Sequence, residues 1–441
     1  MAQRLLYMLI EEDDRELSSR SLLAAIAIEC GFNVVFVPQW TVWQNWEAMP
    51  QGLMFFKGNN KAQAVQMREA KAHGHIVASI EEEALGISDC REVLRCFDER
   101  IARYCDLFLA NGLFEADCIG REFPSVTDRI SVTGNPRTDL LREEFAGDLR
   151  TQADAICAEH GEFMLVNTNF STINPRGDDA LGGFDSCVRV GLVNQRDDQD
   201  IQDFFTWCAW EKVNVSAVGE LMSGLCDRLP WPVIIRPHPT EDLDVWHEVF
   251  DDWQGVQIIR EGGHLAWTAA ASILVHPGCT TGVEALLLGT PALSIVVDDN
   301  PWHWINLSNL VNPIATDIPS AIETIEAFAR GDDRISPRRN EMLERLSRHV
   351  HYQPSRLCSQ IVAEALDGLD VKPVEANVLG KFAKVRMVDP TDGKIDPDRF
   401  NPIAVAGMVN GFRRSLGLVG CAKVCAAGPD LLLCGLSELA T

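Results

Sequence analysis

Metal-binding and disulfide patterns are missing from this 441-residue sequence. Its 14 cysteines are scattered from Cys30 to Cys434, with no Cys-x-x-Cys pair and no clustered cysteine and histidine spacing. Zinc sites and small disulfide-bonded domains require such clusters, so neither class of protein is indicated. Reduced thiols of a cytoplasmic protein are the simplest explanation.

Basic residues are in short supply as well. The sequence holds 39 Lys and Arg against 64 Asp and Glu, which gives a formal net charge of −25. General electrostatics then disfavour binding to nucleic acid or to an anionic membrane surface. The hydrophobic content of 46% is that of an ordinary globular protein, so a packed core is expected.

Long uninterrupted apolar runs are lacking too. The run at residues 4–10 is too short for a signal peptide and predicts a first strand. Residues 263–283 contain no Asp, Glu, Lys or Arg, but a His-Pro-Gly turn at 276–278 interrupts them. We therefore expect no membrane span and a cytoplasmic protein.

Short apolar runs alternate with helical patterns over residues 4–145. Strands are predicted at residues 4–10, 33–38, 53–57, 75–80, 107–110 and 130–133. This alternation is typical of a parallel, doubly wound sheet, and a chain of this length is expected to form two domains. We predict an α/β fold with a Rossmann-like domain at 1–148, a second at 149–352, a closing helix at 353–370 and a C-terminal extension at 371–441.

The stretch at residues 271–298 reads as strand, tight turn, helix and strand. Its turn leaves the first amides of the helix without partners, and the helix dipole makes that end attractive to a phosphate. Gly278 allows the sharp turn, while Thr280 and Thr281 add hydroxyl donors. Glu284, one turn further on, could accept hydrogen bonds from a ribose. The alternative is a threonine pair that only caps the helix.

Two His-Pro pairs follow predicted strands of the second domain. His238 and His276 each end an apolar run and each precede a proline. Arg236 adds a positive charge that could pair with a phosphate, or with a carboxylate instead. A single histidine in such a place is more often structural, but two beside a predicted phosphate site favour a shared pocket.

Polar residues also follow the strand predicted at 163–170, which delivers Thr168 and Asn169 at its far end. The loop at 171–199 is long enough to predict a lid or an acceptor-binding loop, with a mobile insertion as the alternative. Near the C-terminus, residues 389–396 resemble a calcium loop but lack acidic residues at its first and twelfth positions, so a turn is predicted. The apolar stretch at 403–441 is compatible with a packed appendage or with a contact in a homo-oligomer.

Acidic residues cluster after the first and fourth predicted strands, where ligands of doubly wound sheets bind. A carboxylate at this edge could deprotonate an acceptor hydroxyl. Acidic residues also favour helix N-termini, which is the alternative explanation. The candidates for the base are Glu12, Asp14, Glu16, Glu82 and Glu83.

Several blocks, in this order and spacing over residues 4–365, resemble the bacterial surface carbohydrate biosynthesis protein family, whose members are GT-B-like. They are Arg15-Glu16-Leu17, Ser21-Leu22-Leu23-Ala24-Ala25, Glu81-Glu82-Glu83, the segments 132–141 and 166–170, Arg236-Pro237-His238-Pro239 and the segment 276–291. A His-Pro pair followed by two hydroxyl residues is also similar to bacterial sialyl- and Kdo-transferases. That similarity implies contacts of His238 with the donor phosphate or ribose, and of Thr280 and Thr281 with the phosphate.

The resemblance implies a glycosyltransferase that moves a sugar from a CMP- or UDP-linked donor to a glycan or lipid-linked glycan in surface polysaccharide biosynthesis. The first domain would bind the acceptor, with at most peripheral contact with the inner membrane, and no metal or other cofactor would be required. The donor site in the second domain would comprise Thr168, Asn169, Arg236, His238, His276, Gly278, Thr280, Thr281 and Glu284. A nucleotide-sugar 2-epimerase and a non-catalytic nucleotide-binding protein are the alternatives.

Overall fold

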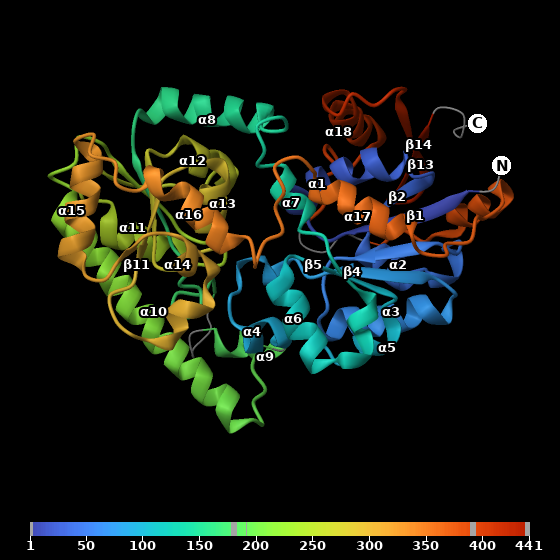
Figure 1. Cartoon of the computed structure of the whole chain (residues 1–441), viewed down its shortest axis with the longest axis horizontal. Coiled ribbons are helices and arrows are strands. Elements are labelled where there is room, and N and C mark those ends of the chain that lie inside the picture. Colours follow the sequence, from blue (N-terminus) through green and yellow to red (C-terminus); the bar gives the residue numbers. More distant parts are fainter. Residues whose placement is uncertain (1–2, 178–182, 191, 389–393, 437–441) are drawn as a thin grey trace. The chain divides into compact units, whose positions relative to one another are not determined.

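The structure is a computed structural model that describes residues 3–177, 183–190, 192–388 and 394–436 (Figure 1). The chain divides into two compact units. Unit 1 comprises residues 1–85, 93–145 and 348–441, and unit 2 comprises 86–92 and 146–347. The helix expected at 353–370 and the extension at 371–441 therefore both belong to unit 1.

Unit 1 is built on an eight-stranded sheet with the order β13-β14-β2-β1-β3-β4-β5-β6. Six strands run parallel: β1 (Arg4–Ile10), β2 (Phe32–Pro38), β3 (Leu53–Phe56), β4 (Ile76–Ile80), β5 (Leu107–Ala110) and β6 (Ile130–Val132). The extension adds an antiparallel hairpin, β13 (Ala422–Gly428) and β14 (Leu431–Leu436), which pairs with β2. The six predicted strands are confirmed to within one residue at each end.

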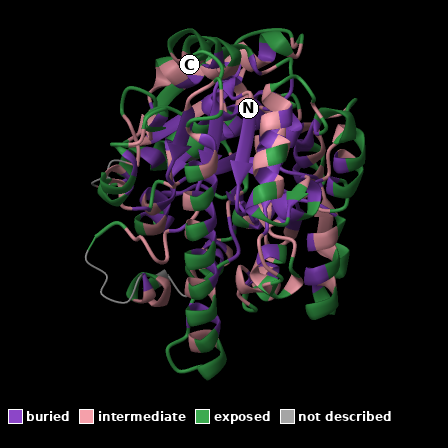
Figure 2. Ribbon diagram, turned by 90° about the vertical axis from the view of Figure 1, so that its left-hand side faces the viewer, coloured by how far each residue is buried: buried purple, intermediate pink, exposed green. Residues whose placement is uncertain are grey.

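Helices cover both faces of this sheet because the side chains of each strand alternate between two cores. Leu6 and Met8 face the core formed with α1 (Asp13–Ala27), α17 (Cys358–Asp367) and α18 (Pro402–Ser415). Leu5 and Tyr7 face the core formed with α3 (Lys61–Ala72), α5 (Ile101–Tyr104) and the 3-10 segment η6 (Ala376–Lys384). Figure 2 shows the buried strands between partly exposed helices.

Unit 2 has a six-stranded, all-parallel sheet with the order β12-β11-β10-β7-β8-β9. The strands are β7 (Met164–Asn167), β8 (Val233–Arg236), β9 (Val256–Ile258), β10 (Ile273–His276), β11 (Ala292–Ile295) and β12 (Ile314–Ala315). Renumbered within the unit and viewed from the β9 edge, this is the 3-2-1-4-5-6 order of a Rossmann fold. The predicted fold class, α/β with two Rossmann-like domains, is confirmed.

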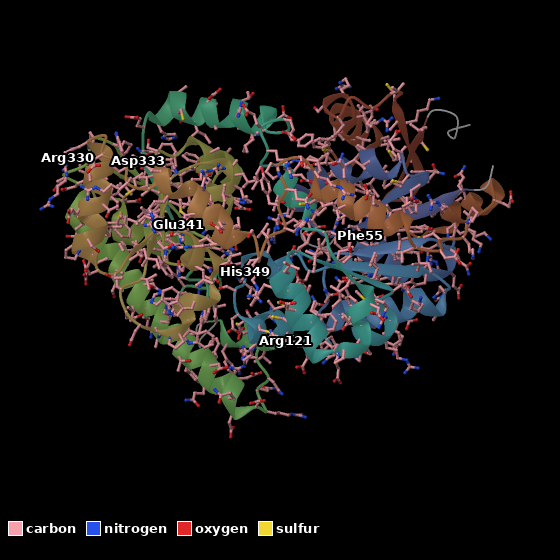
Figure 3. The ribbon with its side chains drawn as sticks, viewed as in Figure 1. Phe55, Arg121, Arg330, Asp333, Glu341 and His349 are labelled. Carbon is pink, nitrogen blue, oxygen red and sulfur yellow. The ribbon has the colours of Figure 1, made fainter. Side chains whose placement is uncertain are left out.

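The unit 2 sheet is also covered on both faces. One core joins the strands to α10 (Asp198–Leu225), α11 (Leu243–Phe250) and α15 (Ile318–Ala329), and the other joins them to α8 (Gly147–His160), α12 (His264–Ala270) and α13 (Thr281–Leu288). Figure 3 labels Arg330 and Glu341, both exposed residues of this unit, and Phe55, which is buried in the sheet of unit 1.

The remaining elements are short and connect the layers of each unit. They are α2 (Gln39–Gln44), η1 (Trp46–Ala48), η2 (Glu83–Gly86), α4 (Cys90–Arg95), α6 (Leu113–Glu122), η3 (Pro124–Arg129), α7 (Pro136–Asp139), α9 (Phe184–Val190), η4 (Pro301–Ile305), α14 (Leu307–Val311), η5 (Ser336–Arg338) and α16 (Arg339–Leu346). The loop at 171–199 contains α9, whereas 178–182 and 191 lie outside the described residues, as does most of the turn predicted at 389–396. None of the helices in the described part of the chain combines the length and apolar composition needed to cross a bilayer.

Candidate functional site

The strand order of unit 2 reverses between β7 and β10, so their carboxyl ends flank the crevice where ligands bind in open α/β sheets. The chain turns away from β10 through Gly278, whose φ is +145°. A side chain there would meet the Asn306 amide, with only 2.8 Å between its Cβ and Nδ2. Glycine is therefore required for the turn that begins α13.

The two threonines at the start of α13 have different environments. Thr281 is buried, and its Oγ1 accepts a hydrogen bond of 3.0 Å from Nδ2 of Asn167, which ties β7 to the helix. Thr280 is exposed, and its hydroxyl does not cap the helix. The amides of Cys279 and Thr280 donate no hydrogen bond to any described residue. Thr280 and these amides thus form a polar helix end whose hydrogen-bond donors can receive an anion.

Glu284 lies one turn further along α13 and is buried. Its Oε2 is 3.1 Å from Nε2 of His264, the first residue of α12, whose side chain is 45% exposed. The pair brings a carboxylate from the first turn of α13 together with the solvent-facing imidazole that begins α12. His264 is not among the predicted residues, because a contact across 20 residues leaves no local pattern in the sequence.

The loop after β8 is organised by Glu241, which is fully buried. Its Oε1 accepts hydrogen bonds from Thr168 Oγ1 (2.7 Å), the Phe170 amide (3.1 Å) and the His238 amide (3.0 Å), and its Oε2 accepts one from Trp246 Nε1 (2.9 Å). Burial raises the pKa of Glu241 although these donors oppose the shift. Thr168 is thus engaged in holding two loops together.

His238 and Asn169 lie at the same sheet edge and are both half-buried. Nδ1 of His238 accepts a hydrogen bond from the Thr240 amide at 3.3 Å and lies 2.6 Å from Thr240 Oγ1. In the neutral ring this assigns the proton to Nε2. The Asn169 side chain makes no hydrogen bond to another described residue. Both side chains offer polar groups beside the crevice.

Arg236 differs from its predicted role. Its guanidinium donates to the carbonyl oxygens of Arg260 (3.0 Å), Glu261 (2.8 Å) and Gly262 (2.9 Å), and stacks on Trp267 at 5.0 Å. Burial lowers its pKa to about 10. Because these donors are committed to the loop after β9, Arg236 shapes the approach to His264 rather than presenting its charge to solvent.

His276 is fully buried, which also differs from the prediction of a shared pocket with His238. Its Nε2 lies 3.1 Å from Asn312 Nδ2 and 3.5 Å from Ser294 Oγ, and a side chain at Gly282 would clash with the ring. Burial lowers the pKa of His276 to about 3, so the ring is neutral. It supports the first turn of α13 from inside the unit.

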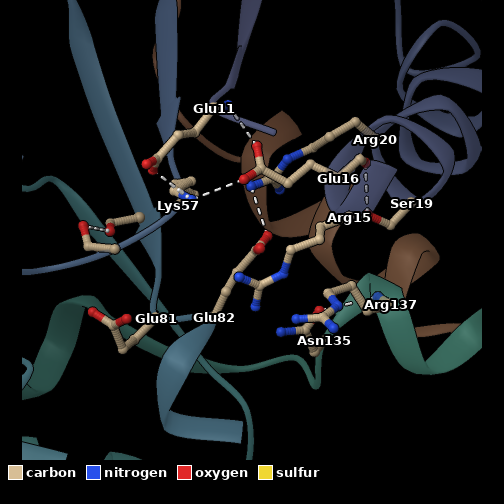
Figure 4. Close-up of polar contacts among 12 residues, drawn as sticks. Glu11, Arg15, Glu16, Ser19, Arg20, Lys57, Glu81, Glu82, Asn135 and Arg137 are labelled. Atoms are coloured by element: carbon tan, nitrogen blue, oxygen red, sulfur yellow. Dashed lines mark hydrogen bonds and ion pairs between the residues drawn. The ribbon is translucent and has the colours of Figure 1, made fainter. Parts of the chain in front are cut away.

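Unit 1 carries charged groups at its own switch point, between β1 and β3 (Figure 4). Lys57, directly after β3, lies 2.7 Å from Glu11 Oε2 and 2.8 Å from Glu16 Oε1. Burial lowers the pKa of Lys57, but the charges of Glu16 and Glu11 outweigh burial and leave the pKa raised. Burial also raises the pKa of Glu16. The charge of Lys57 opposes this shift, and the charge of Glu82 adds to it.

Glu82 is the predicted base with the best-defined environment. Its Oε1 accepts a hydrogen bond of 2.9 Å from Arg20, whose side chain is 1% exposed and stacks 4.3 Å over Phe55. Its second oxygen, Oε2, has no partner among the described residues and is not sealed from solvent. The carboxylate is therefore oriented by one oxygen and open at the other.

The remaining candidates are placed differently. Both oxygens of Glu16 are engaged, by Lys57 and by the Glu11 amide (2.8 Å). Asp14 is exposed and paired with Arg399, and Glu83 is exposed with Arg15 at 3.5 Å. The Glu12 carboxylate lies 3.8 Å from the guanidinium of Arg15.

A second pair of buried carboxyls lies nearby and was not predicted as a site. Burial raises the pKa of Glu81 to about 8 and that of Glu115 to about 7. Asn111 connects them, because its Nδ2 donates to Glu115 Oε2 and to the Glu81 carbonyl oxygen, at 2.8 Å each. The Glu81 carboxylate also accepts from the Asn59 amide (2.6 Å), so this pair braces the loops after β3, β4 and β5.

No family model matches the chain, and no curated protein matches it. Among solved structures, it is similar to UDP-GlcNAc 2-epimerase from Neisseria meningitidis bound to UDP-GlcNAc, with 12% identity, a TM-score of 0.46, and coverage of 82% of this chain and 99% of that chain. It is also similar to the wall teichoic acid polymerase TagF, with 10% identity, a TM-score of 0.44, and coverage of 82% of this chain and 88% of that chain. For the UDP-GlcNAc 2-epimerase of Methanocaldococcus jannaschii the identity is 12%, the TM-score 0.45, and the coverage 74% of this chain and 92% of that chain. Similarity at this level of identity and TM-score carries no functional assignment.

Within the described ranges, no group of three or more His, Cys, Asp or Glu side chains is placed to bind a metal ion. The crevice of unit 2 instead offers backbone amides, a hydroxyl, two histidines and an amide side chain.

Proposed function

We propose that this chain is a glycosyltransferase that moves a sugar from a nucleotide-linked donor, CMP- or UDP-linked, to a hydroxyl of a glycan or lipid-linked glycan acceptor. Unit 2 binds the donor, and unit 1 binds the acceptor and supplies the base. The surface polysaccharide role and the cytoplasmic location belong to the same proposal.

One observation carries the donor half of the proposal. The Rossmann strand order of unit 2 has its switch point between β7 and β10, where α13 is preceded by the Thr280 hydroxyl and by the amides of Cys279 and Thr280, which have no partner among the described residues. Nucleotides bind at such switch points, with phosphate at the helix start. The turn at Gly278 and the Asn167–Thr281 hydrogen bond hold this helix end in place.

The groups around the helix end fit the parts of a nucleotide. The phosphates would accept hydrogen bonds from the Thr280 hydroxyl and from the amides of Cys279 and Thr280, just before α13. The ribose hydroxyls would lie against His264 and Glu284, and His238 and Asn169 would complete the polar wall. No metal is needed in this proposal because the helix end stabilises the departing phosphate.

Glu82 is the proposed base. In the reaction the acceptor oxygen bonds to the anomeric carbon of the donor sugar, and the bond from that carbon to the phosphate oxygen breaks. The nucleotide leaves with the electron pair, and Oε2 of Glu82 takes the hydroxyl proton. Arg20 holds Oε1 and so fixes the direction in which Oε2 points.

A nucleotide screen followed by product analysis tests the proposal. Thermal shift with CMP, UDP and their sugars should identify the donor, because a bound ligand raises the unfolding temperature with its concentration. The identified donor is then incubated with and without glycan acceptors, and the products are separated by mass. Acceptor-dependent transfer supports the proposal. A donor that is altered without any acceptor would indicate a 2-epimerase, and binding without turnover would indicate a non-catalytic protein.

A further inference from the structure

The C-terminal extension returns to the acidic edge of unit 1 through residues 394–399. The Asp13 amide donates to the Lys394 carbonyl oxygen (3.1 Å), and the Asp396 amide donates to Asp13 Oδ2 (2.9 Å). The Lys394 ammonium lies 2.8 Å from Glu11 Oε1. This segment is thus fastened to the first turn of α1, the helix that carries Glu16.

The extension also holds the other end of α1. Arg413 of α18 is 1% exposed and donates to the Ala25 carbonyl oxygen (3.2 Å) and to Glu29 (2.7 Å). A further ion pair, Arg399 with Asp14, joins the extension to the first turn. Because both ends of α1 are held, the extension sets how this helix presents its charged side chains.

Glu11 is shared by two lysines from distant parts of the chain. Its Oε1 faces Lys394 and its Oε2 faces Lys57, which also binds Glu16. Burial raises the pKa of Glu11, but the two lysines outweigh burial and lower the pKa to about 2. Without Lys394, Glu11 would draw Lys57 more strongly and compete with Glu16 for it.

We infer that Lys394 is a positioning residue for the charged groups that surround the proposed base, Glu82. It neutralises Glu11, so that Lys57 keeps its ion pair with Glu16, which lies beside Glu82. The role of the extension is therefore to complete the charge arrangement of the acceptor site. This inference rests on the proposed function.

The charged groups around Lys394 and Lys57 come from every segment packed at this edge. They are Glu11, Glu12, Asp13, Asp14, Arg15, Glu16 and Arg20 from the end of β1 and from α1, Glu82 and Glu83 from the end of β4, and Asp396 and Arg399 from the extension. Acids outnumber bases in this set, so removing one cation shifts the pKa of the remaining carboxyls upward.

The first experiment compares Lys394→Met, Lys394→Arg and Lys372→Met in the full chain. Lys372 is a matched control because it also lies in the extension but pairs with Asp370. For Lys394→Met we expect kcat to fall about tenfold and KM to stay within about twofold, since a misplaced base acts on the chemical step. The acid limb of the pH–kcat profile should move up by about one pH unit. Lys394→Arg should restore both, and Lys372→Met should match wild type.

A second measurement separates this inference from the glycosyltransferase proposal. Carboxyl carbon-13 NMR of glutamate-labelled protein follows the titration of Glu11, with Glu11→Gln to identify its resonance. Lys394→Met should raise the Glu11 midpoint by about one pH unit or more. An unchanged midpoint would overturn the inference whatever the activity. A wild-type protein that turns over no nucleotide sugar would contradict the proposed function instead, and an active Lys394→Met protein with the wild-type pH profile would overturn the inference alone.

Discussion

The carboxyl edges of the two sheets each contain a point where the strand order reverses, but the groups placed there are opposite in chemistry. In unit 1 the switch point is occupied by ion pairs, with Lys57 between two glutamates and Arg20 against Glu82. In unit 2 it is occupied by a helix start, a hydroxyl and neutral polar side chains. Its carboxylates, Glu241 and Glu284, are buried and hold neighbouring groups.

This difference assigns a task to each edge. A helix end with open amides attracts an anion without needing a titratable group, which suits a phosphate. A carboxylate fixed by a buried arginine and open at one oxygen suits proton transfer. In the proposed function, unit 2 binds the nucleotide and unit 1 carries out the proton transfer, and four variants test this difference between the units.

The largest effect is expected for Glu82→Gln. The amide cannot take a proton, so kcat should fall by about 10²- to 10⁴-fold. Nucleotide affinity should change less than about twofold, because no donor-binding residue of unit 2 is altered. Product formation and calorimetry measure the two quantities. Glu83→Gln is the matched control, since Glu83 is the exposed neighbour, and a large loss there with an active Glu82→Gln protein would reverse the assignment of the base.

The next effect is on stability, for Arg20→Met. The change keeps the apolar contact with Phe55 but removes the positive charge that pairs with the buried Glu82 carboxylate. We expect a loss of about 3–5 kcal/mol in the stability of unit 1, measured by urea unfolding. Thr280→Val at the unit 2 edge should cost less than about 0.5 kcal/mol, as an exposed substitution. Equal losses would show that the two edges do not differ in their dependence on charge pairing.

A smaller effect concerns pH. The pKa of Glu115 is raised to about 7 in the folded protein by burial, so the folded state holds a proton that the unfolded state has released. Its stabilising contribution is present below about pH 4.5 and is lost as the pH rises through 7, by up to about 3 kcal/mol. Glu115→Gln should flatten this part of the stability curve between pH 5 and 8. Thermal unfolding of both proteins across that range provides the measurement, and identical slopes would contradict the raised pKa.

The smallest effect is expected for His264→Ala. The side chain is 45% exposed, so folding should be little affected, while the nucleotide loses one polar contact near Glu284. Affinity should weaken by about three- to tenfold, measured by calorimetry. His247→Ala, at a half-buried histidine that pairs with Asp251, serves as control. If both variants bind equally well, His264 does not contact the ligand.

Much of the fold could be predicted from the sequence. The strands of unit 1 are continuous apolar runs, and the helix from Thr281 ends at Gly289, a residue type that favours the left-handed conformation found there. These features depend on neighbouring residues, which is why a local pattern reveals them. The hairpin β13–β14 escaped prediction because its pairing with β2 spans almost the whole chain.

The site was predictable only in part for the same reason. The threonines and Glu82 stand directly after predicted strands or turns, so topology places them at a sheet edge. Whether Arg236 and His276 face solvent or the interior depends on partners such as Trp267 and Asn312. The roles of Lys57, His264 and Lys394 depend on ion pairs between segments far apart in sequence, which no spacing rule encodes.

Calorimetric titration of the full chain with CMP, UDP and their sugars shows whether Thr280 and His264 bind a nucleotide, using wild type, Thr280→Val/His264→Ala and the exposed control Thr151→Val. We predict that wild type and control bind at least one of these nucleotides with a Kd between about 1 µM and 1 mM, and that the double variant binds it at least about tenfold more weakly. Absence of binding to every nucleotide, or equal affinity in the double variant, would contradict this prediction.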